Sequence, residues 1–480
     1  MLFSSPIFIF VFLPIVIFLI GFGRKSLHNT ILLFASIIFY AWGSLSQTPI
    51  FISSIIINYV FGLLINDAEG KKAKILLITG VTINLLLLGY FKYFDFLMEN
   101  INVLFSATGA KPIEYTKVGL PIGISFFTFH AMSYIIDVYR KKVAVQRNFL
   151  DLALYISFFP QLIAGPIVRY IDVATQFQKR TLSLEKATAG IQRFIFGFAK
   201  KVIVANTMAY LADKIFEAPI SQISAGTAWL GIIAYTFQIY FDFSGYSDMA
   251  IGLAKIFGFD FPENFNYPYI AQSIKEFWRR WHISLSTWFR DFLYIPLGGS
   301  KGSNAKTIRN LLIVFFCTGF WHGASWNFVV WGMFHGTFLL IERVGFEKVL
   351  LRLWKPVRIM YTLLVVIIGW VFFRADDLGA AIAYIGKMSF LSSSNQAQIF
   401  LVEYLDTKTV FMLIFATLYS LRAYRWIIER IEKLFLSKNK FNSYLVFFSS
   451  SKFLISMGLF FITVSYLAAS TYNPFIYFRF

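Results

Sequence analysis

Residues 318–336 read TGFWHGASWNFVVWGMFHG and place His322 between a tryptophan and a glycine. The surrounding residues are apolar enough to lie in a lipid bilayer, where burying an ionisable side chain is costly and marks a candidate functional site. The apolar run breaks at Gly-Ala-Ser (323–325) and resumes in a second apolar segment that carries His335. Such a break inside a membrane is tolerated only where protein or a water-filled cavity satisfies the freed backbone groups. From this stretch alone, His322 is either a functional residue or a buried histidine bonded to a carbonyl group.

The composition of the whole chain is typical of a multi-pass membrane protein. Of its 480 residues, 58% are hydrophobic and 14% are charged, and the mean hydropathy is +0.65. Soluble domains carry about 25% charged residues. A net charge of +19 would suggest nucleic-acid binding in a soluble protein, but here the basic residues cluster in short runs between apolar segments. This pattern is typical of cytoplasmic loops and argues against a nucleic-acid partner.

The first apolar run, 6–22, lacks a charged leading region and a small-residue cleavage site, so we expect a retained helix rather than a signal peptide. Arg24 and Lys25 follow it and place that loop in the cytoplasm, with the N-terminus outside. Four more apolar runs alternate consistently with basic cytoplasmic loops at 67–74 and 140–147. These runs are 30–42, 49–65, 74–91 and 118–136.

The middle of the chain is less regular. FFPQLIAGPIVRY (158–170) contains two prolines and a glycine, which predicts a broken or re-entrant helix lining a cavity. Residues 259–281 are polar and aromatic, and we expect them along the cytoplasmic face. The basic segment 421–440 belongs inside, so the tail TYNPFIYFRF (471–480) should emerge outside. The remaining apolar runs are 189–212, 226–246, 309–322, 325–343, 359–374, 408–422 and 452–470.

These runs predict a single all-α polytopic membrane domain covering 1–480, with roughly eleven to thirteen crossings of about 20 residues each plus re-entrant and interfacial pieces. We divide it into N-terminal spans, a motif-dense core, C-terminal spans and an aromatic tail. These parts are 1–117, 118–343, 344–470 and 471–480.

The stretch EFWRRWHISLSTWFRDFLYIPLGGS (276–300) places His282 directly after a Trp-Arg-Arg-Trp cluster. Two interpretations are open for Arg279 and Arg280, and both can hold. They anchor the chain at the cytoplasmic interface, or they bind a phosphorylated donor, because the arginine fork matches phosphate geometry. Trp278 and Trp281 would sit at the headgroup level or flank the donor.

Other chemical groups give weaker signals. Asp242, in DFSGYSDMA, either orients a histidine or caps a helix, and we favour the structural role. His130 is expected to be a packed core histidine, and His335 lies off the helical face of His322. Cys317 is the single cysteine, and no CxxC or Cys/His spacing predicts a metal site. What remains is a membrane-embedded histidine acting as a general base, which indicates group transfer within the bilayer.

Several long motifs, in order, resemble the membrane-bound O-acyltransferase (MBOAT) family, and within it the bacterial alginate and peptidoglycan O-acetyltransferases. The resemblance is dense over 118–343 and returns in NPFIYFRF. The stretches that carry it are SFFTFHAMSYIIDVYR (125–140), FFPQLIAGPIVRY, DFSGYSDMAIGLAKIFGFDFPENFNYPY (242–269), EFWRRWHISLSTWFRDFLYIPLGGS and FWHGASWNFVVWGMFHG (320–336).

This resemblance implies helices arranged around a central tunnel in the bacterial inner membrane. It implies no resident cofactor, but an acetyl group taken from a cytoplasmic donor, acetyl-CoA, and passed across the membrane. A periplasmic partner of the SGNH-hydrolase type would then place the acetyl group on a polysaccharide. His322 matches the family's essential histidine in the FWHG motif, and His282 matches the second recurrent histidine, in WRRWHISLS.

Related systems carry a C-terminal aromatic motif with a tyrosine that is proposed to carry the acyl group, and here this motif would supply Tyr477. With both termini in the periplasm, the tail could fold back into the outward opening and accept acetyl from the His322 site. A phenol is a poor nucleophile at its ordinary pKa of about 10, so His322 would have to act as its base. Alternatively, the tail is only an aromatic membrane anchor.

Three other functions stay open at this point. The acyl group could be D-alanyl or another acyl group delivered by a carrier protein that docks on the basic cytoplasmic face. The protein could also transport a polysaccharide or a lipid-linked sugar without chemistry, although transporters usually show repeated halves and we find no internal repeat here. A structural scaffold for an envelope complex would leave His322 dispensable.

Overall fold

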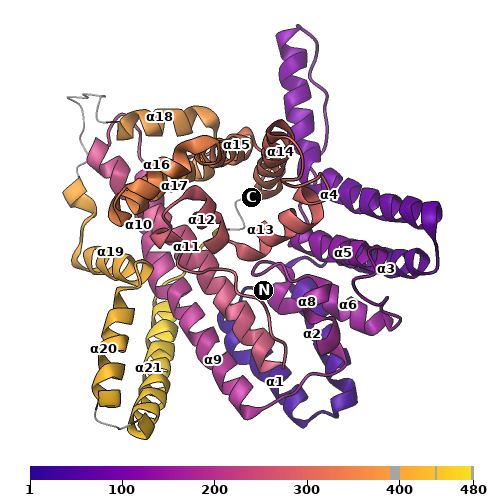
Figure 1. Cartoon of the computed structure of the whole chain (residues 1–480), viewed down its shortest axis with the longest axis horizontal. Helices are drawn as coiled ribbons and strands as arrows, with labels where there is room; N and C mark the ends of the chain where they lie inside the picture. The colour runs from indigo at the N-terminus through magenta and orange to yellow at the C-terminus, as the bar shows by residue number, and fades with distance from the viewer. Residues whose placement is uncertain (390–400, 438–440, 477–480) are drawn as a thin grey trace.

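The structure is a computed structural model that describes residues 1–389, 401–437 and 441–476 (Figure 1). Within these ranges the chain forms helices and loops and no strand, which confirms the predicted all-α class. In the first half the α-helices are α1 (Leu13–Phe22), α2 (His28–Gly43), α3 (Thr48–Asn66), α4 (Gly70–Ala107), α5 (Ile124–Tyr139), α6 (Phe149–Ser157), α7 (Phe159–Leu162), α8 (Tyr170–Val173), α9 (Leu184–Ala199), α10 (Asn206–Phe216) and α11 (Ala225–Ile256). In the second half they are α12 (Ile274–Arg280), α13 (Ile283–Phe289), α14 (Asn304–His322), α15 (Trp326–Ile341), α16 (Glu347–Arg352), α17 (Lys355–Arg374), α18 (Leu378–Met388), α19 (Thr407–Ser420), α20 (Ala423–Ser437) and α21 (Phe441–Ala469).

Helices α9 and α11 run side by side through the middle of the molecule (Figure 1). The N-terminal helices α1 to α5, indigo to purple, lie on one side of this pair, and α19 to α21, orange to yellow, lie on the other. Glycines allow the central pair to approach closely: a Cβ on Gly197 would lie 2.5 Å from the carbonyl oxygen of Gly245. Close backbone approach through small residues is the usual way in which membrane helices pack.

Six helical stretches among the described residues are long and apolar enough to cross a membrane, and the bent pair α19–α20 would make a seventh. The expected eleven to thirteen crossings also counted apolar runs that the structure folds into shorter helices, such as the segment Phe8–Phe22. The long stretches are Lys25–Gly43, Thr48–Asn66, Gly70–Ala107, Leu184–Phe216, Lys355–Arg374 and Ser450–Ala469.

The loops gather at two ends of the helix bundle. At one end, Asp67 after α3 pairs with Arg147 in the loop before α6 at 3.8 Å, and Lys186 at the start of α9 pairs with Asp260 in the loop after α11 at 2.7 Å. We call this the basic end, since the basic loops 67–74 and 140–147 lie there. The opposite end carries the loop after α4 and the ends of α10 and α17, and we call it the far end.

Both predicted helix breaks are present. In the segment 158–170, α7 lasts only four residues and is followed by buried irregular chain, with Gly165 at a φ of +109°. In the opening stretch, α14 ends at His322 and α15 begins at Trp326, where the Ser325 hydroxyl accepts the backbone N–H of Asn327. Breaking the helix here turns the backbone directly after His322 and leaves this side chain at a helix end.

The expectation that Asp242 caps a helix is wrong. The DFSGYSDMA motif lies inside α11, far from its first residue, Ala225, so none of its side chains meets a free helix N-terminus. Apolar residues continue on both sides of the motif, and the helix runs through it.

Candidate active site

His322 is positioned by the close packing of α14 on α15. The two helices meet at Gly319 and Gly332, where a side chain on either residue would overlap the backbone of the other helix. Both glycines begin a Gly-x-x-x-Gly pattern, which allows helices to approach closely in a membrane. His322 therefore lies at a fixed depth in the protein and is only 6% exposed.

The ring of His322 stands edge-on to three aromatic rings. Its centroid lies 5.0 Å from those of Trp321 and Trp331 and 5.2 Å from that of Phe373. Its Nδ1 is buried and has no hydrogen-bond partner among the described residues. His130 and His335 also have buried ring nitrogens without a partner among the described residues, so the position of His322 beside two cavities, and not its unpaired Nδ1 alone, favours its functional interpretation.

Two cavities meet at His322. The first, of about 220 Å³, is lined by Lys92, Ser125 and Ile163 together with the chain around Gly123, at the side of the loop after α4. The second is almost filled by Trp281, Trp331, Trp370, Phe373 and Ile476, with about 10 Å³ free. This free space is close to the smallest that holds one water molecule. His322 therefore lies at a constriction between an open cavity and a narrow one.

Lys92 is a site residue that the sequence analysis missed. Its Nζ donates to the carbonyl oxygens of Trp321 at 2.6 Å and His322 at 3.1 Å, and also to Ser125 at 3.3 Å. These carbonyls end α14, where backbone acceptors lack partners within the helix, and a cation there is favourable. The available signal was a lysine in the middle of an apolar helix, α4.

His282 is also buried, at 1% exposed, but it is part of a hydrogen-bonded group. Its Nδ1 lies 3.1 Å from Oδ1 of Asn264, which also accepts the Ser284 hydroxyl at 2.8 Å. Asn264 in turn donates to Ser247 at 3.0 Å, and Ser284 accepts the backbone N–H of Ile167 at 2.9 Å. We call this set the Asn264 hub; it joins three of the sequence motifs, 158–170, 242–269 and 276–300.

His282 lies close to the His322 site through aromatic contacts. Its ring is 4.6 Å from that of Phe243 and 6.2 Å from that of Trp321, which directly precedes His322. The backbone of His282 has a φ of +42°, a left-handed conformation that is uncommon outside glycine. The Asn264 hub and this backbone conformation together fix the orientation of the His282 ring.

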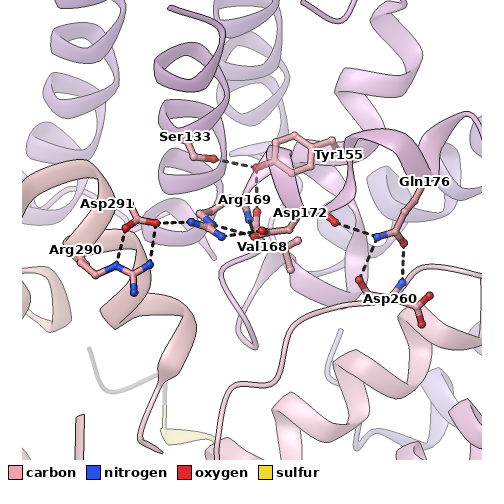
Figure 2. A network of polar contacts seen from close by, with 9 residues as sticks. All are labelled: Ser133, Tyr155, Val168, Arg169, Asp172, Gln176, Asp260, Arg290 and Asp291. Atoms are coloured by element: carbon pink, nitrogen blue, oxygen red, sulfur yellow. Dashed lines mark hydrogen bonds and ion pairs between the residues drawn. The ribbon is translucent and has the colours of Figure 1, made fainter. Parts of the chain in front are cut away.

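A second polar network holds the chain that follows the 158–170 break (Figure 2). Arg169 forms a two-point contact with Asp172, at 3.0 and 2.8 Å, and reaches Asp291 at 2.5 Å, which also pairs with Arg290 at 2.7 Å. Burial alone would raise the pKa of Asp291, but Arg290 and Arg169 hold that pKa below its ordinary value. The network ties the irregular chain to the segment that follows α13, and so supports the Asn264 hub from the basic end.

A scan of family models matches residues 123–375 to the membrane-bound O-acyltransferase family. The matched residues make up more than half of the chain and contain both His282 and His322.

The chain belongs to the membrane-bound O-acyltransferase family.

It is therefore an O-acyltransferase, and its relatives agree. It is 47% identical to a probable alginate O-acetylase AlgI of Azotobacter vinelandii, over 83% of this chain and 81% of that protein. It is 35% identical to a peptidoglycan O-acetyltransferase of Helicobacter pylori, over 100% of this chain and 98% of that protein. A teichoic acid D-alanyltransferase of Bacillus subtilis is 30% identical over 52% of this chain and 66% of that protein.

The structure separates the four residues of this acyltransferase that we expected to bind the donor. Trp281 lines the narrow cavity beside His322, whereas Trp278 packs against Trp331 and His335 in the core. Arg280 pairs with Glu276 at 2.8 Å and donates to the carbonyl of Asn266, and Arg279 is exposed. Donor binding by these four residues stays a prediction.

The tail of this O-acyltransferase enters the protein instead of lying against lipid. Phe475 and Ile476 are buried, at 4% and 3% exposed, and Ile476 lines the narrow cavity with His322. The anchor interpretation therefore does not fit these two residues. Tyr477 lies outside the described residues, directly after Ile476.

Proposed function

We propose that this membrane-bound O-acyltransferase takes acetyl from a cytoplasmic donor, acetyl-CoA, and passes it across the bacterial inner membrane for O-acetylation of a cell-envelope or exported polysaccharide. The names of the relatives with the widest alignments, an alginate O-acetylase and a peptidoglycan O-acetyltransferase, support the acetyl group and the polysaccharide. The observation that carries the mechanism is the position of His322 between two cavities, with the C-terminal tail in one of them.

In this mechanism His322 is the general base and Tyr477 is the acyl relay. The base removes the phenol proton while the phenolate oxygen attacks the thioester carbonyl of the donor. The C–S bond breaks, the acetyl group moves to the tyrosine oxygen, and the proton leaves with the thiolate as free thiol. The resulting phenyl ester has a better leaving group than an alkyl ester, which suits a second transfer to an acceptor. The general-base step is worth on the order of 10²–10⁴-fold in rate.

The narrowness of the constriction supports transfer without leakage. Only about 10 Å³ is free beside the aromatic rings around His322, so bulk water has little access to an acyl intermediate there. The wider cavity on the Lys92 side would give the acceptor or partner access from the opposite direction.

A cavity of about 190 Å³ near the basic end supports a donor route from that side. Its wall contains Asn264, which bonds His282, as well as Arg193 and Lys200. We infer that the basic end faces the cytoplasm, since positive loops are retained there, and that both termini face the periplasm. A periplasmic SGNH-type O-acetyltransferase would then receive the acetyl group at the far end.

Labelled acetyl-CoA and purified protein in liposomes test this function. Mass spectrometry of the C-terminal peptide should find label in the wild type and no label in the Tyr477→Phe and His322→Ala variants. Tyr472→Phe is the matched control, because Tyr472 lies in the same tail five residues earlier. Label that persists in His322→Ala would contradict the base assignment, and label on Tyr472 alone would contradict the relay.

D-alanyl transfer is the second candidate, because one relative is named a teichoic acid D-alanyltransferase. That relative aligns with only about half of the chain, whereas the peptidoglycan O-acetyltransferase aligns with all of it. Offering the protein a D-alanyl carrier protein and acetyl-CoA in competition separates the two. Acetyl on the tail, and no D-alanyl, is the expected result.

A further inference from the structure

A buried ion pair links the two central helical segments, joining the chain just after α9 to α11. Nζ of Lys201 is 2.8 Å from Oδ1 of Asp242, and each side chain is 2% exposed. Removing two charges from water is expensive, and a buried pair often stabilises a fold no better than apolar residues would. A pair at this depth in a membrane protein therefore calls for a functional explanation.

A local irregularity in the helix makes the pair possible. After α9 the chain forms a π-helical turn, Lys200–Ala205, before continuing as α10. Lys200 and Lys201 are adjacent, yet each reaches a different acid on α11: Lys200 contacts Asp248 at 2.6 Å, and Lys201 contacts Asp242. Single π-turns inside α-helices are frequent at functional sites.

Both members of the buried pair also bind the backbone of the C-terminal tail. Lys201 donates to the carbonyl oxygen of Pro474 and to Oδ1 of Asn206, the latter at 2.9 Å. Oδ2 of Asp242 accepts the backbone N–H of Ile476 at 2.9 Å. Buried backbone groups need such partners, and here the cation meets a carbonyl and the carboxylate meets an N–H.

Neighbouring contacts guide the tail to this point. The Tyr472 hydroxyl donates to Asp213 at 2.5 Å, and Asn473 accepts from Asn206 and donates to the Ser4 hydroxyl, each at 3.1 Å. Phe475 then stacks on a buried tyrosine ring, with centroids 4.9 Å apart. Every residue from 472 to 476 thus contacts the helix bundle.

We propose that Lys201 and Asp242 form a seat for the C-terminal tail, holding residues 474–476 so that Ile476 lines the narrow cavity of His322. Both are positioning residues, since they act through the tail backbone. The role of this seat in acyl transfer rests on the proposed function, whereas its binding of the tail does not. The carbonyl of Pro474 and the N–H of Ile476 are buried backbone groups, and an apolar pocket would leave both unpaired.

The adjacent pair Lys200–Asp248 provides a matched comparison. It joins the same two helices and is also largely buried, with side chains 15% and 19% exposed. Among the described residues its contacts are with Arg193 and the ring of Tyr419, and none is with the tail. Removing one lysine or the other should therefore have different effects on the tail.

Cysteine accessibility in the full chain measures the tail directly. Cys317→Ser removes the native thiol, and Phe475→Cys places a reporter beside the seat. We expect slow maleimide labelling in this background, and labelling on the order of tenfold or more faster in Lys201→Met and in Asp242→Asn, because hydrogen bonds to charged groups exceed neutral ones in strength. Lys200→Met should leave the reporter protected.

Two further cysteine reporters distinguish release of the tail from a change in the stability of the whole protein. Ser470→Cys is exposed and should label at the same rate in every variant, while Ala234→Cys, buried in α11, should stay protected in every folded variant. The exchanged pair, Lys201→Asp with Asp242→Lys, restores the charges but turns the ammonium toward the Ile476 N–H. We expect it to recover stability and still expose the tail.

Equal protection of the Phe475→Cys reporter in folded Lys201→Met and in the background would overturn the seat, as would equal exposure in Lys200→Met. No acyl transfer is needed for this readout. The seat can therefore fail while label still reaches Tyr477, and the relay can fail while the tail is still held. If the seat and the relay proposals are both correct, Lys201→Met should lower tail acetylation while leaving His322 intact.

Discussion

His322 and His282 are two buried histidines whose rings both lie near that of Trp321, and they differ in what surrounds their ring nitrogens. Nδ1 of His322 has no partner among the described residues and lies at the junction of two cavities. Nδ1 of His282 is bonded within the Asn264 hub. An unpaired nitrogen beside a cavity can take a proton from a reactant, whereas a nitrogen already bonded to an amide holds structure. The comparison favours His322 as the base and a supporting role for His282, and both roles stay predictions.

The largest effect should come from His322→Ala. If His322 is the base, acyl transfer falls by on the order of 10²–10⁴-fold. The fold should persist, because the variant removes a side chain whose Nδ1 bonds nothing in the described structure. Transfer from labelled acetyl-CoA and thermal unfolding in detergent measure the two effects. Unchanged transfer in a folded His322→Ala protein would contradict the role of His322 as the base.

His282→Ala should cost stability more than chemistry. It removes one hydrogen bond to Asn264, whose Oδ1 still accepts the Ser284 hydroxyl, and a buried hydrogen bond contributes about 0.5–1.5 kcal/mol to the free energy of unfolding. His282→Asn should restore part of that loss, because asparagine tolerates positive φ and still offers a donor. A chemical role for His282 would instead appear as a folded His282→Asn protein with transfer as low as in His322→Ala.

Lys92→Met tests whether the position of His322 depends on the cation at the end of α14. The variant keeps the length of the side chain but removes the cation that binds the carbonyls of Trp321 and His322. We expect a fall in the transfer rate on the order of tenfold, with little change in KM, because His322 loses its fixed position while the wall of the donor route is unchanged. Steady-state kinetics measure this, and Lys117→Met, on an exposed lysine, is the control. A raised KM alone would place Lys92 in substrate binding.

Asp291→Asn should have the smallest effect, below about 1 kcal/mol at neutral pH, because partly exposed ion pairs contribute little. The effect should depend on pH. The pKa of Asp291 is held below its ordinary value by Arg290 and Arg169, so its contribution to stability is present above the ordinary carboxyl pKa of about 3.9 and is lost as the pH falls through the lowered value. Unfolding measured from pH 3 to 7 should therefore show a shallower acid decline in the variant than in the wild type.

Much of the fold and part of the site could be predicted from local sequence. The Gly-Ala-Ser break after His322 and the proline-containing break in 158–170 each produce a helix interruption, because backbone preference acts within a few residues. The motifs also indicated His322 and His282. Asp242 was misplaced, since a Ser/Asp-containing motif is equally compatible with a helix start and, as here, with the interior of a long buried helix.

The remaining features depend on contacts between distant parts of the chain. Lys92 meets the end of α14 about 230 residues later in sequence, and the tail reaches Lys201 from more than 270 residues away. No local pattern marks such partners, because their attraction exists only once the helices have packed. The sequence by itself determined an all-helical membrane acyltransferase with a histidine at a helix break, since composition, periodicity and motifs are properties of neighbouring residues. Only the tertiary structure decided which histidine lies between two cavities and where residues 472–476 of the tail are held, because burial and hydrogen bonding are set by the helices that surround each group.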